Sequence, residues 1–546
     1  MNDARTPDGG SADDPVAAST GTLDALLAQR AAQSPDAVYL EDARSDRALT
    51  FAELRELTTA WRERFGELAL RPSAAVLVDL ADPLAFAVVH LAAIAHGLRS
   101  LPVDPSAAAG EPARLAGLIR GAGVLVSDGD DDRAVAGVAR IRPADAESGG
   151  LRPDVVEFPA DAGSAATVPV DPAEPRETGS AVLFTSGSTG TPKGVELPEP
   201  QLLFVARQVV DDLRLEPGDR GFNSLPLHHV NAEVVALLAT LTAGSTLVLD
   251  RRFRRTGFWE LLAERRVTWL NAVPAILAVL ARSGPLAPPA TLRLIRCASS
   301  PLPDRIREQL DPIPLVLSWG MTEGASQITA TDPTPAASAE GVGLPRGSEV
   351  VARGDDGAAL AAGEVGALWI RGPGVIDGYL FGAAADRFDA DGWLRTGDLG
   401  AVDADGRVSL VGRDDDVINR GGEKVYPGEV EEVLLQDERV QEAVVIGRPD
   451  EVLGAVPVAY VIPAPGVERS ESADAELVAS LTAAADRGLA RFRRPVEIAV
   501  VADLPRAAAG KVQRSRVREL DAPSGPAAPS GPTGPTAPSA PAGAAG

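Results

Sequence analysis

Apolar residues in the first part of the chain follow two spacings, one typical of buried strands and the other typical of helices. Short apolar runs alternate with helical segments, the runs lying at 76–80, 101–103 and 124–126 and the helical segments at 83–95 and 112–120. This order predicts a parallel sheet, because parallel strands need long crossover connections. Helical spacing also covers 23–32 and 51–68, and Thr50 is a residue type that caps helices.

The same alternation returns after residue 202. We predict strands at 223–225, 246–249, 267–271, 292–297 and 315–318, and helices at 202–213, 232–241, 258–265, 274–282 and 303–310. Segments 366–372 and 408–411 indicate a β-rich subdomain, and 417–520 has a compact α+β pattern. The predicted fold class is α/β, with a large N-terminal domain of doubly wound, mostly parallel sheets plus the β-rich subdomain, and a small α+β C-terminal domain.

Composition marks the limits of these parts. Residues 1–18 are acidic and without periodicity, and 522–546 form a Pro/Ala/Gly-rich tail, so we expect both to be disordered. Three consecutive acids at 414–416 indicate an exposed junction. We therefore predict a large domain at 19–413 and a small domain at 414–521.

Charge and cysteine content exclude several function classes. The 546 residues carry a formal net charge of −25, which argues against nucleic acid or an anionic membrane as the main partner. A single cysteine, Cys297, excludes an intrachain disulfide and is typical of a reducing compartment. No basic and then apolar leader opens the chain, and the apolar segment 83–94 is too short to span a membrane. We expect a cytoplasmic protein.

A loop without apolar side chains follows the short apolar strand at 181–184. All eight residues from Thr185 to Pro192 are hydroxylic, glycine or proline, and Lys193 closes the loop. Glycines let backbone N–H groups approach a ligand, hydroxyls donate hydrogen bonds, and lysine adds a compact positive charge, which together suit a polyphosphate. The loop is not a Walker loop, because Pro192 precedes the lysine and Gly194 follows it. A flexible Ser/Gly linker is the alternative.

Lysine is rare in this chain. Of 52 basic residues only Lys193, Lys424 and Lys511 are lysines. A chain that uses arginine elsewhere keeps lysine where a strongly hydrated ammonium does what a guanidinium cannot, although chance retention is the alternative.

Five motifs in register resemble those of the adenylate-forming superfamily, which comprises AMP-binding acyl-CoA synthetases, peptide-synthetase adenylation domains and luciferases. They are TSGSTGTPKG (185–194), SWGMTE (318–323), RTGDLG (395–400), GRDDDVINRGGEKVYPGEVE (412–431) and PRAAAGKVQR (505–514). The match covers nearly all of residues 20–520, so accident is negligible.

The resemblance implies an AMP-forming ligase that uses ATP and Mg²⁺ to activate a small-molecule carboxylic acid as an acyl-adenylate. Pyrophosphate is released, and the acyl group passes to coenzyme A. Both reactants of the first step are anions, so the site must cancel charge and align the reacting oxygen. A carrier-protein thiol, an amine or another nucleophile is the alternative acceptor, and a non-catalytic or luciferase-like relative is a further alternative. The acid, the acceptor and the oligomeric state are left open.

By the same resemblance, the loop and its lysine hold the β- and γ-phosphates, Glu323 positions Mg²⁺, and Trp319 covers the adenine where relatives usually have tyrosine. Asp398 and Arg413 bind the ribose. The implied nucleotide-binding set is Thr185, Ser186, Gly187, Ser188, Thr189, Gly190, Lys193, Ser299, Ser300, Trp319, Gly320, Met321, Thr322, Asp398, Arg413 and Lys511. Plainer alternatives are a helix N-terminal acid for Glu323, a turn residue for Asp398 and an exposed charge run for Arg413.

The implied catalytic residues are Lys511, Lys193, Glu323, His229 and Lys424. Lys511 bridges the carboxylate and the α-phosphate during adenylation. Lys424 serves thioester formation after the small, mobile domain rotates about a hinge matched by Asp415. Asn419 stands where some relatives have a second lysine, so a plain surface lysine is the alternative for Lys424.

The segment LPLHHV (225–230) resembles the one whose histidine borders the carboxylate, and the register points to His229, with a core histidine as the alternative. The implied acyl pocket consists of His229, Val230, Asn231, Ala298, Gly320, Met321, Gly324 and Gln327. No aspartate in this segment could pair an α-ammonium, which argues against an amino acid substrate. Cys297 is predicted to be a small buried residue. Pro198 and Glu199 stand where relatives often have Thr-His or Ser-His.

Replacing Lys511 tests the implied division of labour. Lys511→Ala should abolish carboxylate-dependent exchange of pyrophosphate into ATP, because no other group would bridge the two reacting anions. A preformed acyl-adenylate should remain usable by the variant. Normal exchange in Lys511→Ala would contradict the assignment.

Overall fold

The structure is a computed structural model that describes residues 21–120, 122–129, 131–144, 151–157, 178–185, 192–281, 286–338, 341–506 and 512–521. The chain divides into two compact units, Met1–Val417 and Ile418–Gly546. Each unit encloses its own hydrophobic core.

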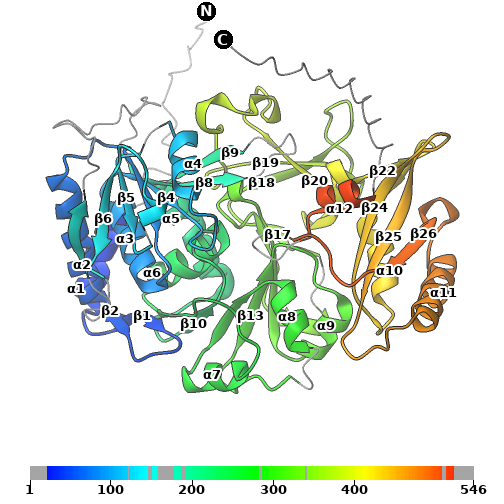
Figure 1. Ribbon diagram of the computed structural model, residues 1–546, viewed down its shortest axis with the longest axis horizontal. Coiled ribbons are helices and arrows are strands. Elements are labelled where there is room, and N and C mark those ends of the chain that lie inside the picture. The colour runs from blue at the N-terminus through cyan, green and yellow to red at the C-terminus, as the bar shows by residue number, and fades with distance from the viewer. Residues whose placement is uncertain are drawn as a thin grey trace, which may run out of the picture. The chain divides into compact units, whose positions relative to one another are not determined.

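One sheet of the first unit has the strand order β7-β6-β5-β3-β4-β8-β9 (Figure 1). Its strands are β3 (Ala75–Asp79), β4 (Arg99–Pro102), β5 (Val124–Ser127), β6 (Ala139–Pro143), β7 (Pro153–Glu157), β8 (Ser180–Thr185) and β9 (Lys193–Pro198). The pairs from β6 to β8 are parallel, and the two edge strands β7 and β9 run antiparallel to their neighbours.

The second sheet has the order β17-β15-β14-β13-β12-β10-β11-β1-β2, with β16 paired to β14. Its strands are β1 (Val38–Asp42), β2 (Ala48–Thr50), β10 (Arg220–Asn223), β11 (Thr246–Leu249), β12 (Trp269–Ala272), β13 (Leu294–Ala298), β14 (Pro314–Trp319), β15 (Thr329–Ala330), β16 (Thr334–Pro335) and β17 (Leu344–Pro345). All pairs from β1 to β14 along this order are parallel, so the carboxyl ends of these strands share one edge.

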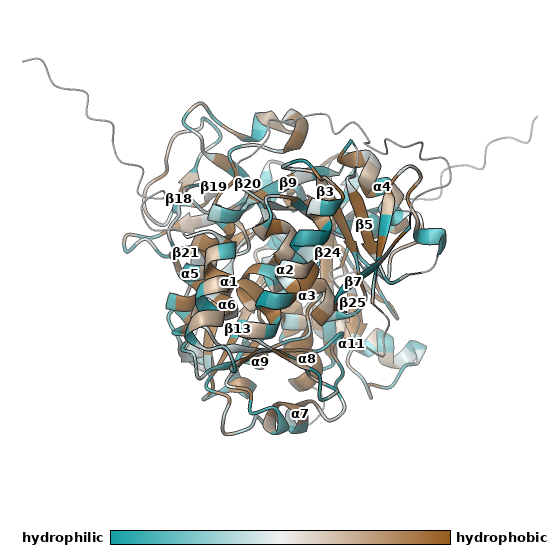
Figure 2. Cartoon of the chain, turned by 90° about the vertical axis from the view of Figure 1, so that its left-hand side faces the viewer, coloured by the Kyte–Doolittle hydropathy of each residue, from teal (hydrophilic) through white to brown (hydrophobic). Residues whose placement is uncertain are grey.

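Helices cover both faces of the sheets. They are α1 (Leu23–Gln33), α2 (Phe51–Glu67), α3 (Pro83–Ala95), α4 (Glu111–Leu118), α5 (Glu199–Leu213), α6 (Ala239–Ala243), α7 (Phe258–Glu264), α8 (Pro274–Ala281) and α9 (Asp304–Leu310). Helices α1, α2 and α3 lie side by side (Figure 2), and α3 is buried from Leu84 to Ile94. Among the helices of the described residues, none is long and apolar enough to cross a bilayer.

The predicted cap of α2 is confirmed. Thr50 Oγ1 accepts from the Glu53 N–H at 3.2 Å, and Glu53 Oε2 accepts from the Thr50 N–H at 2.8 Å. This reciprocal arrangement is a capping box, which satisfies two backbone donors that the helix leaves unpaired.

The structure differs locally from the sequence predictions, and two of these differences have a clear physical reason. The predicted helix at 232–241 is instead a π-helix, η3 (Asn231–Leu238), followed by α6. The strand β9 was not predicted, because its burial pattern includes the charged Glu196. Apolar periodicity does not distinguish α from π hydrogen bonding, and it cannot anticipate a buried acid that a distant arginine neutralises.

The β-rich subdomain is an antiparallel sheet of order β18-β19-β20-β21. Its strands are β18 (Glu349–Arg353), β19 (Gly366–Arg371), β20 (Leu394–Val402) and β21 (Val408–Arg413). The large unit thus combines two mostly parallel sheets with this smaller sheet, as the sequence predicted.

The second unit is α+β. Its sheet has the order β23-β22-β25-β24, with β26 parallel to β25. The elements are β22 (Ile418–Arg420), β23 (Glu423–Val425), α10 (Pro427–Leu435), β24 (Val440–Asp450), β25 (Gly454–Pro463), α11 (Glu471–Gly488), β26 (Glu497–Val500) and α12 (Arg514–Asp521). Leucines from α10 and α11 enter one core with the strands. The predicted fold class is confirmed.

A buried ion pair joins β9 to the sheet. The Arg99 guanidinium on β4 donates from Nε to Glu196 Oε1 at 2.8 Å, and both side chains are 4% exposed. Ser180 on β8 donates from Oγ to the same carboxylate oxygen at 2.8 Å. The Glu196 carboxylate therefore links β9 to β4 and β8, next to the strand residue Lys193 that closes the loop.

Breaking this pair should destabilise the large unit. Glu196→Ala leaves the Arg99 guanidinium buried and unpaired, so the free energy of unfolding should fall by about 3–5 kcal/mol. The double variant Arg99→Met/Glu196→Leu removes both charges and should recover most of that loss. Urea unfolding followed by circular dichroism measures both. Equal loss in the single and double variants would show that the charge is not the cause.

Candidate functional site

The ends of the predicted phosphate loop meet in a strand pair. Thr185, the last residue of β8, lies opposite Lys193, the first residue of β9. A Cβ on Gly194 would approach Leu380 Cδ1 to 2.9 Å, so glycine permits the close packing there. The other predicted loop residues, Ser186, Gly187, Ser188, Thr189 and Gly190, lie outside the described residues.

Lys193 faces a buried tyrosine that contacts Glu323. The Lys193 Nζ atom lies 5.6 Å from the Tyr379 ring centroid. The Tyr379 hydroxyl donates to Glu323 Oε1 at 2.7 Å and accepts from Arg387 Nη1 at 2.6 Å. Burial, with the neighbouring Glu323 carboxylate, raises the pKa of Tyr379, so the phenol keeps its proton and its role as a donor.

Arg387 is itself held by backbone carbonyl groups. Its Nη2 atom donates to the carbonyl oxygens of Arg395 and Thr396 at 2.6 and 2.7 Å. Its Nη1 atom lies 3.4 Å from Glu323 Oε1. The buried Glu323 carboxylate therefore has a neutral donor and a cation beside it.

Trp319, Asp398 and Arg413 form a second group. The Trp319 indole N–H donates to Asp398 Oδ2 at 2.9 Å, and Arg413 Nη1 lies 3.3 Å from Asp398 Oδ1. Asp398 on β20 is directly opposite Arg413 on β21. Each carboxylate oxygen thus has one of these partners and retains capacity to accept from a ligand hydroxyl.

The chain doubles back after Trp319. A Cβ on Gly320 would lie 1.7 Å from the Ser326 carbonyl oxygen, so only glycine is accommodated. The Met321 carbonyl accepts from the N–H groups of Gly324 and Ser326 at 3.1 and 3.0 Å. Ser326 has a φ of 83°, a left-handed conformation that is strained in a non-glycine residue. The half-buried Thr322 and the buried Glu323 lie in the short turn η4 (Thr322–Gly324).

The predicted acyl-pocket residues come from three segments. Val230 and Asn231 lie at the start of η3, and Ala298 ends β13, where the exposed Ser299 and Ser300, which were predicted to bind the nucleotide, follow it. Gln327 closes the turn after β14, and its Oε1 atom accepts from the Ser318 hydroxyl at 3.3 Å. Asn231 Nδ2 lies 3.5 Å from Ser299 Oγ, which brings the first two segments together.

Two adjacent imidazoles lie just before Asn231. The rings of His228 and His229 have centroids 4.6 Å apart, and Asp104 Oδ2 lies 3.9 Å from His228 Nε2. Burial lowers the pKa of both rings, and for His228 burial together with the neighbouring His229 lowers it to about 4. His229 Nε2 is buried and has no hydrogen-bond partner within the described part of the chain. Both rings are neutral at physiological pH.

In the second unit, Lys424 lies on β23 opposite Asn419 on β22. Gly421 and Gly422 form the turn between them with positive φ values of 62° and 95°. Asn419 Oδ1 accepts from the Gly422 N–H at 3.0 Å, so Asn419 stabilises the turn that carries Lys424. Lys511 lies outside the described residues.

The departure at Pro198 and Glu199 has a structural explanation. Pro198 precedes α5, and the buried Glu199 carboxylate accepts from the backbone N–H of Leu23 at the start of α1. Burial raises the pKa of Glu199. This acid therefore joins two helices.

Cys297 is buried, and burial raises the pKa of its thiol to about 12, in agreement with the small buried residue that was predicted.

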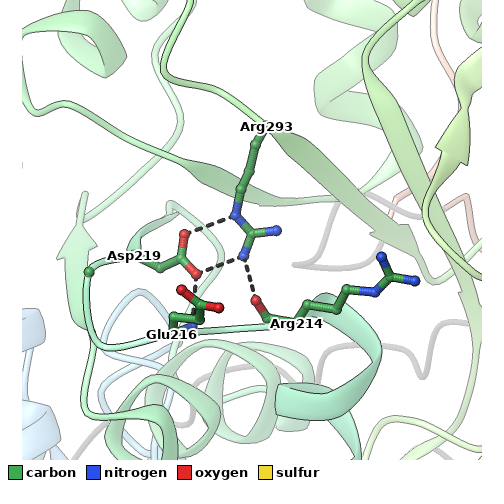
Figure 3. A pocket seen from close by; sticks show the side chains of 5 residues that line it. Arg214, Glu216, Asp219 and Arg293 are labelled. Carbon is green, nitrogen blue, oxygen red and sulfur yellow. Dashed lines mark hydrogen bonds and ion pairs between the residues drawn. The ribbon is translucent and has the colours of Figure 1, made fainter.

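A polar hollow lies away from these groups. Its lining comprises Arg214, Glu216, Gly218, Asp219 and Arg293 (Figure 3). Arg293 donates to Asp219 at 2.9 and 2.7 Å and to the Leu213 carbonyl at 3.0 Å. Asp219 and Arg293 precede β10 and β13, which places the hollow at the amino ends of parallel strands. Ligands of open α/β sheets bind at the carboxyl ends, where Thr185, Ala298 and Trp319 lie.

A magnesium site at Glu323 would need ligands from the nucleotide. Within the described residues, no three or more His, Cys, Asp or Glu side chains are grouped to hold a metal ion. Mg²⁺ is commonly bound through one or two carboxylates plus substrate phosphates, so a single glutamate beside a phosphate loop fits that chemistry.

Sequence reasoning missed Tyr379, Arg387 and Arg296. Tyr379 and Arg387 lie in a segment without regular periodicity, and only their contacts with Glu323 distinguish them. Arg296 could have been found, because it is a charge within the predicted buried strand 292–297. Such a charge requires a compensating or functional environment.

The histidine pair yields a pH-dependent prediction. Since the folded pKa of His228 is about 4, below the ordinary value of 6.5, the unfolded chain binds its proton first as pH falls. The stability that neutral His228 contributes is complete above about pH 6.5 and is lost progressively toward pH 4. NMR titration of the imidazole C–H signals, assigned with a His228→Asn variant, measures this. A His228 signal that titrates near pH 6.5 would contradict the burial argument.

Comparisons with known proteins agree with this geometry. A model of the AMP-binding enzyme family matches residues 27–380, and a model of the AMP-binding enzyme C-terminal domain matches residues 429–511. The sulfoacetate–CoA ligase of Cupriavidus necator is 36% identical over 91% of this chain and 97% of that protein. The indoleacetate–CoA ligase of Aromatoleum aromaticum is 34% identical over 65% of this chain and 70% of its own.

Solved structures are similar over the same length. The o-succinylbenzoate coenzyme A synthetase of Bacillus subtilis, in complex with ATP and magnesium, superposes with a TM-score of 0.75 at 28% identity. The match covers 90% of this chain and 99% of that one. The chain therefore belongs to the AMP-binding enzyme family, within the adenylate-forming superfamily that its five motifs indicated.

Proposed function

We propose that this chain is an ATP-dependent acid:CoA ligase. It activates a small-molecule carboxylic acid as an acyl-adenylate, releases pyrophosphate and transfers the acyl group to coenzyme A. Two relatives that match nearly its full length are named sulfoacetate–CoA ligase and oxalate–CoA ligase. The similar solved structures include complexes with ATP and magnesium and with an acyl-adenylate.

One observation carries the proposal. A chain of contacts leads from Lys193 through Tyr379 to Glu323, and Glu323 lies four residues after Trp319. Trp319 then contacts Asp398, which contacts Arg413. Groups suited to phosphate, adenine and ribose thus lie in one set of linked residues within the large unit.

The charges of these groups suit the first half-reaction. We assign Thr185 and Lys193 to the phosphates that leave as pyrophosphate, because positive charge beside them lowers the cost of separating that anion. We assign Trp319 to the adenine face and Asp398 with Arg413 to the ribose. Glu323 would hold Mg²⁺, which supplies charge neutralisation at the phosphates when bound.

The acyl group would lie beside the histidine pair. Because burial keeps His229 neutral, its ring can border a carboxylate without adding charge to the pocket. The unpartnered Nε2 atom leaves capacity for one hydrogen bond with a substrate. We assign His229 to positioning of the substrate acid.

The second unit would serve both steps. We place the large domain at 19–413 and the small domain at 414–521, with a hinge near Asp415. We assign Lys511 to adenylation and Lys424, on its glycine turn, to thioester formation. Asn419 supports that turn through its hydrogen bond to the Gly422 N–H at 3.0 Å.

Pyrophosphate exchange tests the proposal. Wild-type protein is given ATP, Mg²⁺ and single acids, including sulfoacetate, oxalate, indoleacetate, 2-succinylbenzoate and 4-coumarate, and exchange is measured before coenzyme A is added. We expect at least one acid to support exchange and coenzyme A to convert its adenylate to a thioester. Exchange without thioester formation would overturn the coenzyme A step, and no exchange with any acid would overturn adenylation.

A matched pair of variants locates the nucleotide site. Asp398→Asn should raise the KM for ATP about 10- to 100-fold, since hydrogen bonds to a charged group contribute roughly 1.5–3 kcal/mol. Asp405→Asn changes an exposed acid in the turn between β20 and β21 and should leave the KM unchanged. Equal effects of the two substitutions would argue against a role for Asp398 in binding ATP.

A further inference from the structure

Arg296 is a buried charge without a carboxylate partner in the described residues. It lies on β13 and is 0% exposed. Its guanidinium donates to Asn231 Oδ1 at 3.0 Å, to Ser318 Oγ at 3.1 Å and to Asn271 Oδ1 at 3.5 Å, all of them neutral acceptors. Its Nε atom has no partner among these residues. Burial lowers its pKa to about 10, so the group remains a cation at neutral pH.

The position of Arg296 is next to the acyl pocket. Asn223, Asn271 and Arg296 form one row across β10, β12 and β13, close to the carboxyl ends of these strands. The neighbouring residue Cys297 points to the opposite face, into the core beneath α7 to α9. The polar row therefore faces η3, which begins at Asn231.

Arg296 fixes the orientation of Asn231. Asn231 Oδ1 accepts from Arg296 Nη1 and from Asn271 Nδ2, each at 3.0 Å. The amide oxygen therefore points inward, and the NH₂ group must point outward. There it lies 3.5 Å from the exposed Ser299 hydroxyl, a contact too long to be a strong hydrogen bond. The outward NH₂ group of Asn231 thus retains donor capacity, and the positive charge of Arg296 lies behind it.

The nearest acidic residue in this network, Asp212, already forms an ion pair with another arginine. Asp212 is joined to Arg296 by hydrogen bonds only through Ser318 and Gln327, whose Nε2 atom donates to Asp212 at 2.7 Å, and the two charges also attract each other at longer range. Asp212 pairs with Arg346 at 3.0 Å. The imidazoles of His228 and His229 are neutral, so they add no positive charge to that of Arg296. A buried cation in this state favours an anion beside it.

We propose that the amide of Asn231 and the hydroxyl of Ser299, oriented and charged from behind by Arg296, bind a second anionic group on the substrate acid. This inference rests on the proposed function and narrows its substrate class to short acids with a second carboxylate or a sulfonate. Arg296 acts as a positioning residue, since its contact with the pocket runs through Asn231.

Length-matched acids test the inference. Wild-type protein should use malonate and sulfoacetate with a kcat/KM at least about 10-fold above that for propionate in the exchange assay. Asn231→Asp keeps the shape but replaces the donor with an anion. It should raise the KM for malonate and sulfoacetate about 10- to 100-fold and that for propionate by less than about 3-fold. Comparing the KM for malonate with that for sulfoacetate shows whether the subsite prefers a carboxylate or a sulfonate.

Two further variants separate positioning from folding. Arg296→Met should reduce the preference for malonate over propionate, and Arg296→Lys should restore part of it. Arg293→Met removes an arginine at the other end of the same strand and should leave the preference unchanged. If Arg296→Met does not fold, as judged by circular dichroism, Asn231→Asp alone decides. Equal use of malonate and propionate by the wild type, or equal loss of both in Asn231→Asp, would overturn the inference.

Calorimetric titration of malonate and propionate into wild type and Asn231→Asp repeats the comparison without turnover. Tighter binding of malonate that the variant loses supports the subsite even if no acid supports exchange. Absent exchange together with selective malonate binding would refute the proposed function but not the subsite. Binding of malonate that is no tighter than that of propionate would refute the subsite.

Discussion

The cost of burying charge governs how this large unit is built. Arg99 and Glu196 neutralise each other between β4 and β9, and so tie the strand that begins at Lys193 into its sheet. Glu323 is buried beside the Tyr379 hydroxyl and Arg387. Asp398 accepts a hydrogen bond from the Trp319 indole and forms an ion pair with Arg413. Because an unpaired buried charge costs several kcal/mol, each of these contacts holds its element in place as well as its side chain.

We propose that these charged groups surround the anionic substrates. The two large sheets supply Lys193 and Trp319, the turn η4 after β14 supplies Glu323, and the β-rich subdomain supplies Asp398 and Arg413. Adenylation joins two anions, so its barrier depends on positive charge and donors that are already oriented before the substrates arrive. A rigid sheet edge provides that orientation better than a loop does. Within the described part of the chain, Arg296 is buried with neutral hydrogen-bond acceptors and no carboxylate in contact, and the proposed anion subsite depends on that charge.

Neutral groups are as important as charged ones in the acyl region. Burial keeps His228 and His229 uncharged, while Tyr379 keeps its proton. The left-handed conformation of Ser299, with a φ of 86°, turns the chain sharply after β13 and exposes its hydroxyl. Strain of this kind costs roughly 1–3 kcal/mol and persists where the surrounding structure over-determines it. Backbone constraint at Ser299 and suppressed ionisation of the two histidines therefore both define the region that we propose binds the acid.

The sequence by itself determined the fold class, most helices and strands, and the family. Apolar periodicity depends on neighbouring residues alone, so it located α2 and its Thr50 cap. Each of the five motifs is continuous in the sequence, so the motifs could be recognised without knowledge of tertiary contacts. The roles of Lys511 and of residues 186–190 stay predictions. Only the tertiary structure decided that Glu196 pairs with Arg99, that Tyr379 contacts Glu323 and that Asn231 presents its amide outward. Each of these depends on residues distant in sequence, and no local pattern records which buried charge will find which partner.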